Sequence, residues 1–214
     1  MKRPLTTLFV LALVLPIAGA SLAHENHVHE RTPQRAAVVP AAPARPATLS
    51  FDFGGPFSLV DHEGRRRTDK DFRGRHMLVF FGYAQCKSIC PVGLGRMAQA
   101  LDEMGEAGDR IQPVFITVDP ASDTPDVIAR HVRGIHPRMI GLTGTRDELR
   151  AAAKAYNVEV KLLSKPGDGE PIYAHGSFIF LMKPDGGFAT LFPPIMGPEA
   201  IAASLRRYVA RNVE

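Results

Sequence analysis

The chain has 214 residues, 45% of them hydrophobic, and a formal net charge of +4 at neutral pH. This length fits one domain of ordinary size with appendages. The net charge becomes less positive if an N-terminal leader containing Lys2 and Arg3 is removed, because that segment has no acidic residue. The remaining charge is too small to indicate nucleic-acid binding, so we expect no nucleic-acid partner.

Residues 1–23 have the pattern of a secretory signal peptide. Two basic residues precede the uncharged run from Leu8 to Ala20, and small residues near Ala20 and Ala23 suit cleavage. A retained membrane anchor stays open as the alternative, because the uncharged stretch approaches the ~20 residues that span a bilayer. Pro16 and the short apolar core favour cleavage. We expect an exported protein in the bacterial periplasm, either free or anchored to the inner membrane by its N-terminus.

Residues 24–50 are predicted to form a disordered linker. Proline and alanine dominate its second part, and no apolar period of a helix or strand survives there. His24, His27 and His29 lie at its start. They either capture a metal ion loosely or belong to a solvated tail, and composition favours the tail.

Residues 51–214 are predicted to form the folded domain. Met77 to Gly82 is a continuous apolar run, typical of a central strand that is buried on both faces. Further strands are expected at Phe51 to Phe53, Phe57 to Val60, Val114 to Val118, Met139 to Leu142, Ser177 to Met182 and Phe188 to Leu191. Pro184 to Gly187 is a turn signal between the last two strands, so a hairpin is expected near the end of the chain.

Helix start signals alternate with these strands. Pro91 fits the first position of a helix that runs to Met104, which predicts Cys90 as its N-cap. Thr124 is expected to cap a second helix, and Thr145 to Glu148 is a capping box for a third. The last helix is expected from Pro198 to Val209. Strands and helices in this order indicate a mixed α/β domain of the thioredoxin-like class, with an N-terminal β-hairpin and helices flanking a central sheet.

The two cysteines, Cys86 and Cys90, lie between a buried strand and a predicted helix start. A structural disulfide is the alternative, but a bridge over so short a loop gains only ~2 kcal/mol, and a domain of this size does not need it. A helix N-terminus favours thiolate, and Lys87 adds a cation beside Cys86. We therefore expect thiolates that either bind a metal or exchange disulfides.

The segment from Phe81 to Pro91 resembles the Phe-Gly-Tyr-x-x-Cys-x-x-x-Cys-Pro motif of the Sco/SenC family of cytochrome c oxidase copper-assembly proteins. Further matches follow in the same order. They lie at Gly54 to Leu59, Thr117 to Pro120, Asp123 to Pro125, Gly141 to Gly144, Ala155 to Tyr156 and His175 to Gly186. The resemblance therefore covers nearly all of residues 51–214.

The resemblance implies that Cys86, Cys90 and His175 are copper ligands in a thioredoxin-like domain. Two thiolates and one imidazole suit Cu(I), whereas structural zinc normally takes four protein ligands. The chain departs from the family pattern at Lys87 and Ser88, where proline and aspartate are usual, and at Ala174 and Gly176 beside the histidine. These changes leave the ligands in place and affect the residues around them.

Three functions are compatible with these residues. The first is a metallochaperone, not an enzyme, that takes copper from an upstream periplasmic donor and delivers it to the dinuclear copper site of cytochrome c oxidase subunit II or to another exported copper protein. The second is a thiol-disulfide oxidoreductase that uses Cys86 and Cys90 as its redox-active pair. The third is a copper buffer or redox sensor.

Other candidate residues are weaker. Asp119 and Asp123 are candidates to face the metal site or a partner, and Asp123, beside Thr124 and Pro125, equally fits a local cap or turn residue. Met97 and Met104 lie seven apart on a helical stripe, which favours a core position. The isolated histidines are expected at the surface: His62, His76, His131 and His136.

Overall fold

The computed structural model describes residues 53–164 and 171–211. The predicted signal peptide, the histidine segment and the linker lie outside this range, as does the predicted start of the domain at Phe51. The described residues belong to one unit, Thr48–Glu214.

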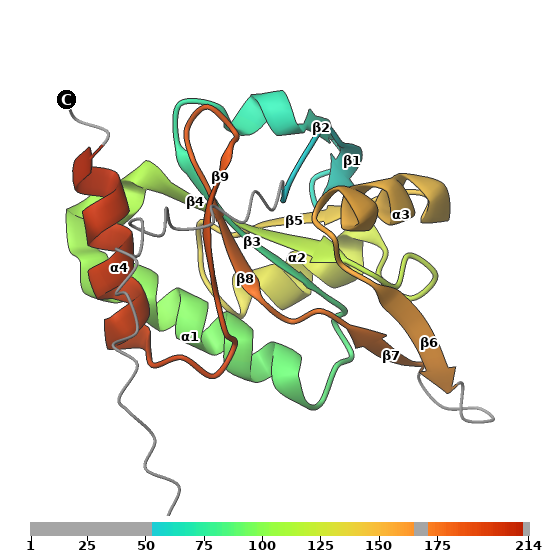
Figure 1. Cartoon of the computed structure of the whole chain (residues 1–214). Coiled ribbons are helices and arrows are strands. Elements are labelled where there is room, and N and C mark those ends of the chain that lie inside the picture. The colour runs from blue at the N-terminus through green and yellow to red at the C-terminus, as the bar shows by residue number, and fades with distance from the viewer. Residues whose placement is uncertain (1–52, 165–170, 212–214) are drawn as a thin grey trace, which may run out of the picture. The chain divides into compact units, whose positions relative to one another are not determined.

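A mixed sheet of seven strands forms the centre of the fold (Figure 1). Its strand order is β2-β1-β5-β4-β3-β8-β9. The three inner strands β3 (His76–Gly82), β4 (Ile111–Thr117) and β5 (Ile140–Thr143) are parallel. Antiparallel strands complete the two sides: β1 (Ser58–Asp61) and β2 (Arg66–Thr68) on one, β8 (Ile179–Met182) and β9 (Phe188–Phe192) on the other. Each residue of β3 and β4 is buried, which explains their continuous apolar sequence.

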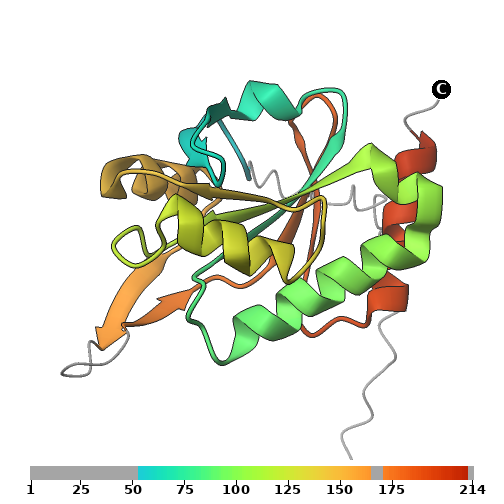
Figure 2. The ribbon, with the colours of Figure 1, turned by 180° about the vertical axis from the view of Figure 1, so that it is seen from behind.

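Two crossover helices cover the same face of the sheet. The helices α1 (Ile89–Met104) and α2 (Pro125–Arg133) connect β3 to β4 and β4 to β5. Since right-handed crossovers that move in one direction place their helices on one face, α1 and α2 lie together, as seen in Figure 2. The C-terminal helix α4 (Pro198–Arg211) packs against α1, and α3 (Arg146–Ala155) lies on the opposite face.

Most predicted elements are confirmed, with shifted ends. Thr124 caps α2 and the Thr145 capping box opens α3, both as expected. However, α1 begins at Ile89 with Ser88 as N-cap, so Cys90 is not the cap. The first N–H groups of a helix have no partner inside it, and proline therefore fits anywhere in the first turn. Phe53 is not part of a strand, and the rest of that predicted strand lies outside the description.

A second sheet was not predicted. It is the antiparallel pair β6 (Val160–Ser164) and β7 (Ile172–His175). All five residues of β6 are exposed, so the strand lacks the alternation that would reveal it. Two short 3-10 helices, Asp69–Phe72 and Gly105–Arg110, complete the description. In the described part of the chain, no helix is long and apolar enough to span a membrane.

Candidate metal centre

Both cysteines lie at the carboxyl end of the central strand, where β3 leads into α1. β3 and β4 pair in register up to Gly82 and Thr117, so the loops that follow these strands meet at one edge of the sheet. This edge is the usual position for a site in a parallel α/β sheet. Cys86 and Cys90 are both buried and free.

Gly82 allows a close approach beside the second cysteine. A Cβ atom at this position would lie 3.2 Å from Cys90 Sγ and 3.1 Å from ring atoms of Phe80 and Phe115. Such contacts are tighter than side chains normally make. The absence of a side chain at Gly82 thus lets the Cys90 thiol pack directly against the end of β3.

A buried hydrogen-bond network fixes the cysteine loop from behind. Asp123 Oδ2 accepts hydrogen bonds from the Thr117 hydroxyl at 2.5 Å and from the Ala84 backbone N–H at 3.0 Å. Burial raises the pKa of Asp123 above its ordinary value. The Asp119 carboxylate accepts a hydrogen bond from the Tyr173 hydroxyl at 3.0 Å. The two aspartates therefore brace the loop and the β6–β7 hairpin. Thr117 and Tyr173, which complete this network, were not singled out from the sequence.

His175 lies at the same edge of the sheet, just before a strand that runs antiparallel to β3. β8 runs antiparallel to β3 with Ile179 paired to Phe80, so residues just before β8 lie beside the carboxyl end of β3. His175 is the last residue of β7 and is half-buried. Its Nε2 lies 3.4 Å from Cys90 Sγ. The fold thus joins two residues that are 85 positions apart in the chain.

The second nitrogen of His175 has a partner that fixes the ring. Nδ1 lies 3.3 Å from the Gly176 carbonyl oxygen. A carbonyl oxygen only accepts, so this contact requires the proton on Nδ1 and leaves the Nε2 lone pair directed toward Cys90. Burial lowers the pKa of His175, which favours the neutral ring. Metal-binding histidines are commonly oriented by such a bond from their other nitrogen.

The two thiols differ in acidity. Burial opposes ionisation of Cys86, but hydrogen bonds from the Cys90 thiol and from the backbone N–H groups of Ser88 and Cys90 outweigh it, so the pKa of Cys86 is lowered. Burial and the neighbouring Cys86 thiol raise the pKa of Cys90. The pKa shift of Cys86 agrees in direction with the expected thiolate, whereas that of Cys90 is opposite to it, because complete burial removes the solvation of charge that the helix terminus does not replace.

Cys90 is the centre of this group, since its Sγ lies 3.4 Å from His175 Nε2 and its thiol helps to lower the pKa of Cys86. Among the described residues, no three histidine, cysteine or acidic side chains converge as a preformed metal cage. The rings of Tyr83 and His175 make an edge contact, with centroids 6.1 Å apart and planes at 80°. What the fold provides is a thiolate-favouring cysteine, a buried thiol and an imidazole lone pair in one cluster.

The other candidate residues lie elsewhere. Met97 and Met104 are buried in the core, as expected. His76 and His136 are also buried, so the surface prediction for them is wrong. His136 is satisfied inside the protein because its Nδ1 accepts a hydrogen bond from the Arg138 backbone N–H. His131 is half-buried and packs against the ring of Phe115.

Comparison with known proteins finds one family throughout the domain. Residues 45–210 match the model of the family described as SCO1/SenC. The mitochondrial SCO1 homolog of Homo sapiens is 35% identical over 201 residues, which are 93% of this chain and 65% of the human protein. Protein SenC of Rhodobacter capsulatus is 39% identical over 158 residues, 74% of this chain and 71% of SenC.

Solved structures agree with this match. The structure of Bradyrhizobium japonicum ScoI with copper bound has a TM-score of 0.68 and 36% identity, and it covers 73% of this chain and 99% of ScoI. BsSco, described as a member of the Sco family of cytochrome c oxidase assembly proteins, shares the fold at 20% identity and a TM-score of 0.59. These neighbours confirm the thioredoxin-like class. The chain belongs to the SCO1/SenC family.

Proposed function

We propose that the protein is a copper metallochaperone that binds one copper ion through Cys86, Cys90 and His175. The observation that carries this proposal is the 3.4 Å contact between Cys90 Sγ and His175 Nε2, with Cys86 in the loop that leads into the same helix. Two sulfur donors and one imidazole nitrogen form a soft set that suits Cu(I). The copper-bound state of the related ScoI supports the choice of metal.

Copper binding and proton release are coupled at this site. Thiolates are the ligand form, so copper entry displaces the proton that burial holds on Cys90. The neutral His175 supplies its Nε2 lone pair without losing a proton. A set of three ligands leaves a coordination position that a partner's ligand enters, and transfer then proceeds by ligand exchange.

The acceptor and the location are proposed by analogy with the family. We infer delivery to the dinuclear copper site of cytochrome c oxidase subunit II, or to another exported copper protein, after loading by an upstream periplasmic donor. The chain spans 65% of the length of the human relative, and family membership concerns the shared domain. Residues 1–23 are proposed to export the chain to the bacterial periplasm or to anchor it to the inner membrane, and residues 24–50 to link that segment to the domain.

A second function, thiol-disulfide exchange, is favoured by the difference in acidity between the cysteines. The Cys86 thiolate would attack a target disulfide and form a mixed disulfide, releasing one target thiolate. Cys90 would then lose its proton to solvent and attack Cys86 Sγ, which breaks the mixed disulfide and releases the second target thiolate. The products are a Cys86–Cys90 disulfide and a fully reduced target, so two electrons pass from this protein to the target.

Copper titration of the purified full chain tests the site. We expect one tightly bound copper per reduced chain and its loss in the double variant Cys86→Ser, Cys90→Ser. The matched control replaces His24, His27 and His29 by glutamine and should keep the tight site while losing only loose uptake. Unchanged stoichiometry in the double variant would exclude the proposed ligands.

Deleting the protein in its host separates delivery from reduction. If it delivers copper, oxidase activity should fall and added copper should restore it. If it acts only as a reductase of the target cysteines, copper should not restore the activity. An unchanged oxidase activity would favour a copper buffer or redox sensor.

A further inference from the structure

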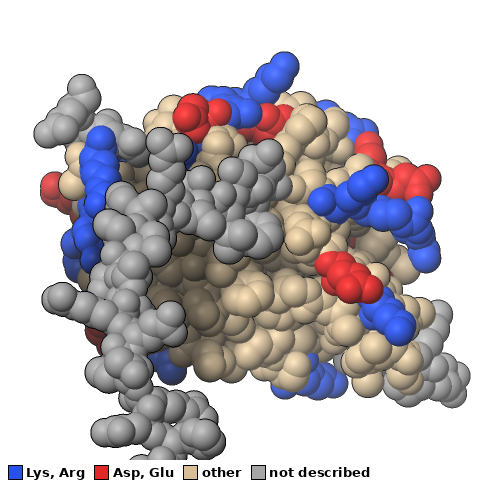
Figure 3. All heavy atoms as spheres, viewed as in Figure 1, with Lys and Arg blue, Asp and Glu red and all other residues tan. Residues whose placement is uncertain are grey.

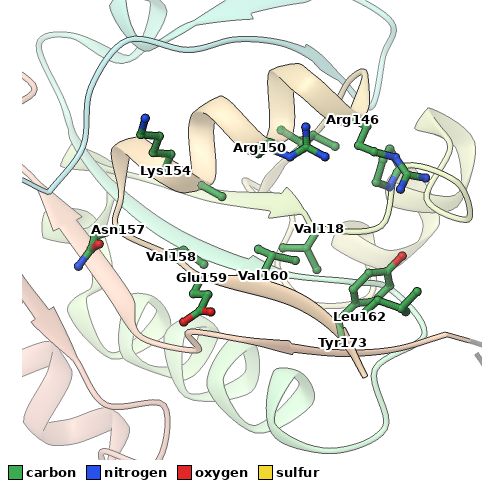
Figure 4. A pocket seen from close by; sticks show the side chains of 13 residues that line it. Val118, Arg146, Arg150, Lys154, Asn157, Val158, Glu159, Val160, Leu162 and Tyr173 are labelled. Atoms are coloured by element: carbon green, nitrogen blue, oxygen red, sulfur yellow. The ribbon is translucent and has the colours of Figure 1, made fainter. Parts of the chain in front are cut away.

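We propose that a groove between α3 and β6 binds an acidic, partly apolar segment of the protein that exchanges copper with this chain. This α3–β6 groove has a volume of about 450 Å³ and is lined mainly by α3, β6, the end of β4 and Tyr173 (Figure 4). This docking site rests on the proposed function, because it is the place where a copper-exchanging partner would bind. The charge, the apolar surface and the position of the groove each support it.

One wall of the groove is cationic. Arg146, Arg150 and Lys154 are exposed, line the groove and lie four residues apart along α3, so they share one face of the helix. Figure 3 shows positively charged side chains gathered over α3. The ion pair of Arg150 with Asp147 is 3.0 Å long, but both side chains are largely exposed, and such pairs are weak. Among the described residues that line the groove, Glu159 is the single acid. The wall therefore favours a partner that carries carboxylates.

The opposite wall is apolar and accessible. Val160 and Leu162 line the groove and are 37% and 50% exposed. Leu163 and Ile172 of the same hairpin are 59% and 46% exposed. Leu163 and Ile172 do not line the groove, so Val160 and Leu162 form the exposed part of its apolar wall, a surface that a partner can cover. A cationic wall facing an apolar wall fits a segment in which acidic and apolar side chains alternate.

The strand register places the proposed copper ligand His175 on the same face of the hairpin as two residues of the groove. In an antiparallel pair, residues directly opposite each other project from the same face. Val160 pairs with His175, and Leu162 pairs with Tyr173. The face that presents His175 to Cys90 therefore also presents Val160 and Leu162 to the groove. A segment bound there would hold its protein beside His175, where an incoming copper ligand is needed.

The test uses the full chain, free of copper, and a labelled eight-residue peptide in which glutamate and leucine alternate. Fluorescence anisotropy should show saturable binding that weakens with salt, because the contacts are partly ionic. A peptide with lysine in place of glutamate should not bind. The double variant Arg150→Gln, Lys154→Gln should bind the acidic peptide about tenfold more weakly. The control variant Arg130→Gln, Arg207→Gln removes two exposed charges from other helices and should bind as the wild type does.

The outcomes separate the docking site from its rivals. No saturable binding by about 1 mM peptide, or equal binding by the double variant and the wild type, would overturn the proposal. So would tighter peptide binding after Glu25→Gln and Glu30→Gln, because the chain's own N-terminal segment would then be the occupant. A third outcome is that the peptide does not bind but the chain binds vesicles with anionic headgroups, and that this binding is lost in Arg150→Gln, Lys154→Gln. That result would identify a lipid surface as the partner instead.

Copper titration of the same samples distinguishes this proposal from the proposed function. Loss of peptide binding with unchanged copper stoichiometry in Arg150→Gln, Lys154→Gln is the expected result. If Leu162→Ser also weakens the peptide and leaves copper binding intact, both walls of the groove contribute. A wild-type chain that binds the peptide but no copper would refute the copper site and leave the groove as a docking site.

Discussion

The two halves of the candidate metal centre are supported in different ways. The cysteine loop follows a strand that is buried at every position, and Asp123 fastens it to the neighbouring strand from inside the protein. The β6–β7 hairpin that carries His175 is largely exposed, and the described hydrogen bond that ties it to the β4 side of the site is that of Tyr173 to Asp119. The two cysteines thus belong to the core, whereas the imidazole of the candidate site belongs to an appendage.

This difference assigns a separate task to each half. If copper binds as proposed, the core-anchored thiol pair would hold the ion while the more exposed hairpin withdraws the third ligand. Exchange with a partner would then begin at His175, on the hairpin face that also lines the α3–β6 groove.

Replacing the imidazole should have the largest effect. His175→Ala removes the proposed nitrogen ligand, so we expect the affinity for Cu(II) to fall more than about 100-fold. Loss of a residue that only orients a ligand usually lowers metal affinity by less than this. Cu(I), which the two thiolates still hold, should be less affected. The rate of disulfide exchange in His175→Ala should stay close to that of the wild type. The measurements are Cu(II) affinity and exchange rate with a small disulfide for both proteins. If His175→Ala binds copper as the wild type does but has lost disulfide exchange, the protein would be assigned as a thiol-disulfide oxidoreductase.

The thiol pair itself should react asymmetrically. Cys86 has a lowered pKa and is 8% exposed, whereas Cys90 has a raised pKa and is fully buried. At pH 8 we expect iodoacetamide to modify Cys86 at least about tenfold faster than Cys90, as read by mass spectrometry. The pH midpoint for Cys86 should lie below its ordinary value of 9.0. It should rise in Cys90→Ala, which removes a hydrogen bond to the thiolate. Equal rates for the two cysteines would contradict the asymmetry.

The same contrast explains what the sequence could predict. The cysteine loop follows local signals, an apolar strand before it and a helix with a proline in its first turn after it, and both depend on neighbouring residues. His175 was assigned only through a family resemblance, because its contact with Cys90 depends on the antiparallel pairing of β8 with β3. The hairpin and its groove were missed, since β6 is exposed on both faces and has no hydrophobic period. The acidity of Cys90 was predicted with the wrong sign because burial is a property of the fold.

Removing the internal brace should cost stability. Asp123→Ala leaves the Ala84 N–H and the Thr117 hydroxyl without their acceptor, so the free energy of unfolding should fall by about 1–3 kcal/mol at pH 7. Because the folded pKa of Asp123 is raised, the folded state takes up a proton before the unfolded state does. Acidification from above that pKa toward 3.8 should therefore stabilise the wild type relative to the variant.

Urea unfolding at several pH values between 7 and 4 measures this difference. Asp123→Asn, which has no titrating carboxyl, is the matched control and should lack the added stability on acidification. A gap between the wild type and Asp123→Asn that stays constant with pH would show that the carboxyl is not protonated preferentially in the folded state.

Loosening the hairpin should give the smallest effect. Tyr173→Phe deletes only the hydroxyl that donates to Asp119 at 3.0 Å and keeps the ring, which packs 5.4 Å from the ring of Tyr83. The expected loss in unfolding free energy is about 1 kcal/mol, the net value of one hydrogen bond. If the hairpin controls the third ligand, the variant should release copper several-fold faster to a chelator while its stoichiometry stays at that of the wild type. Tyr208→Phe, which removes a hydroxyl from α4 that donates to the Ala189 carbonyl, is a control of the same chemistry away from the site. It should lose comparable stability without faster release, so equal release rates in the two variants would mean that the hairpin does not gate the copper.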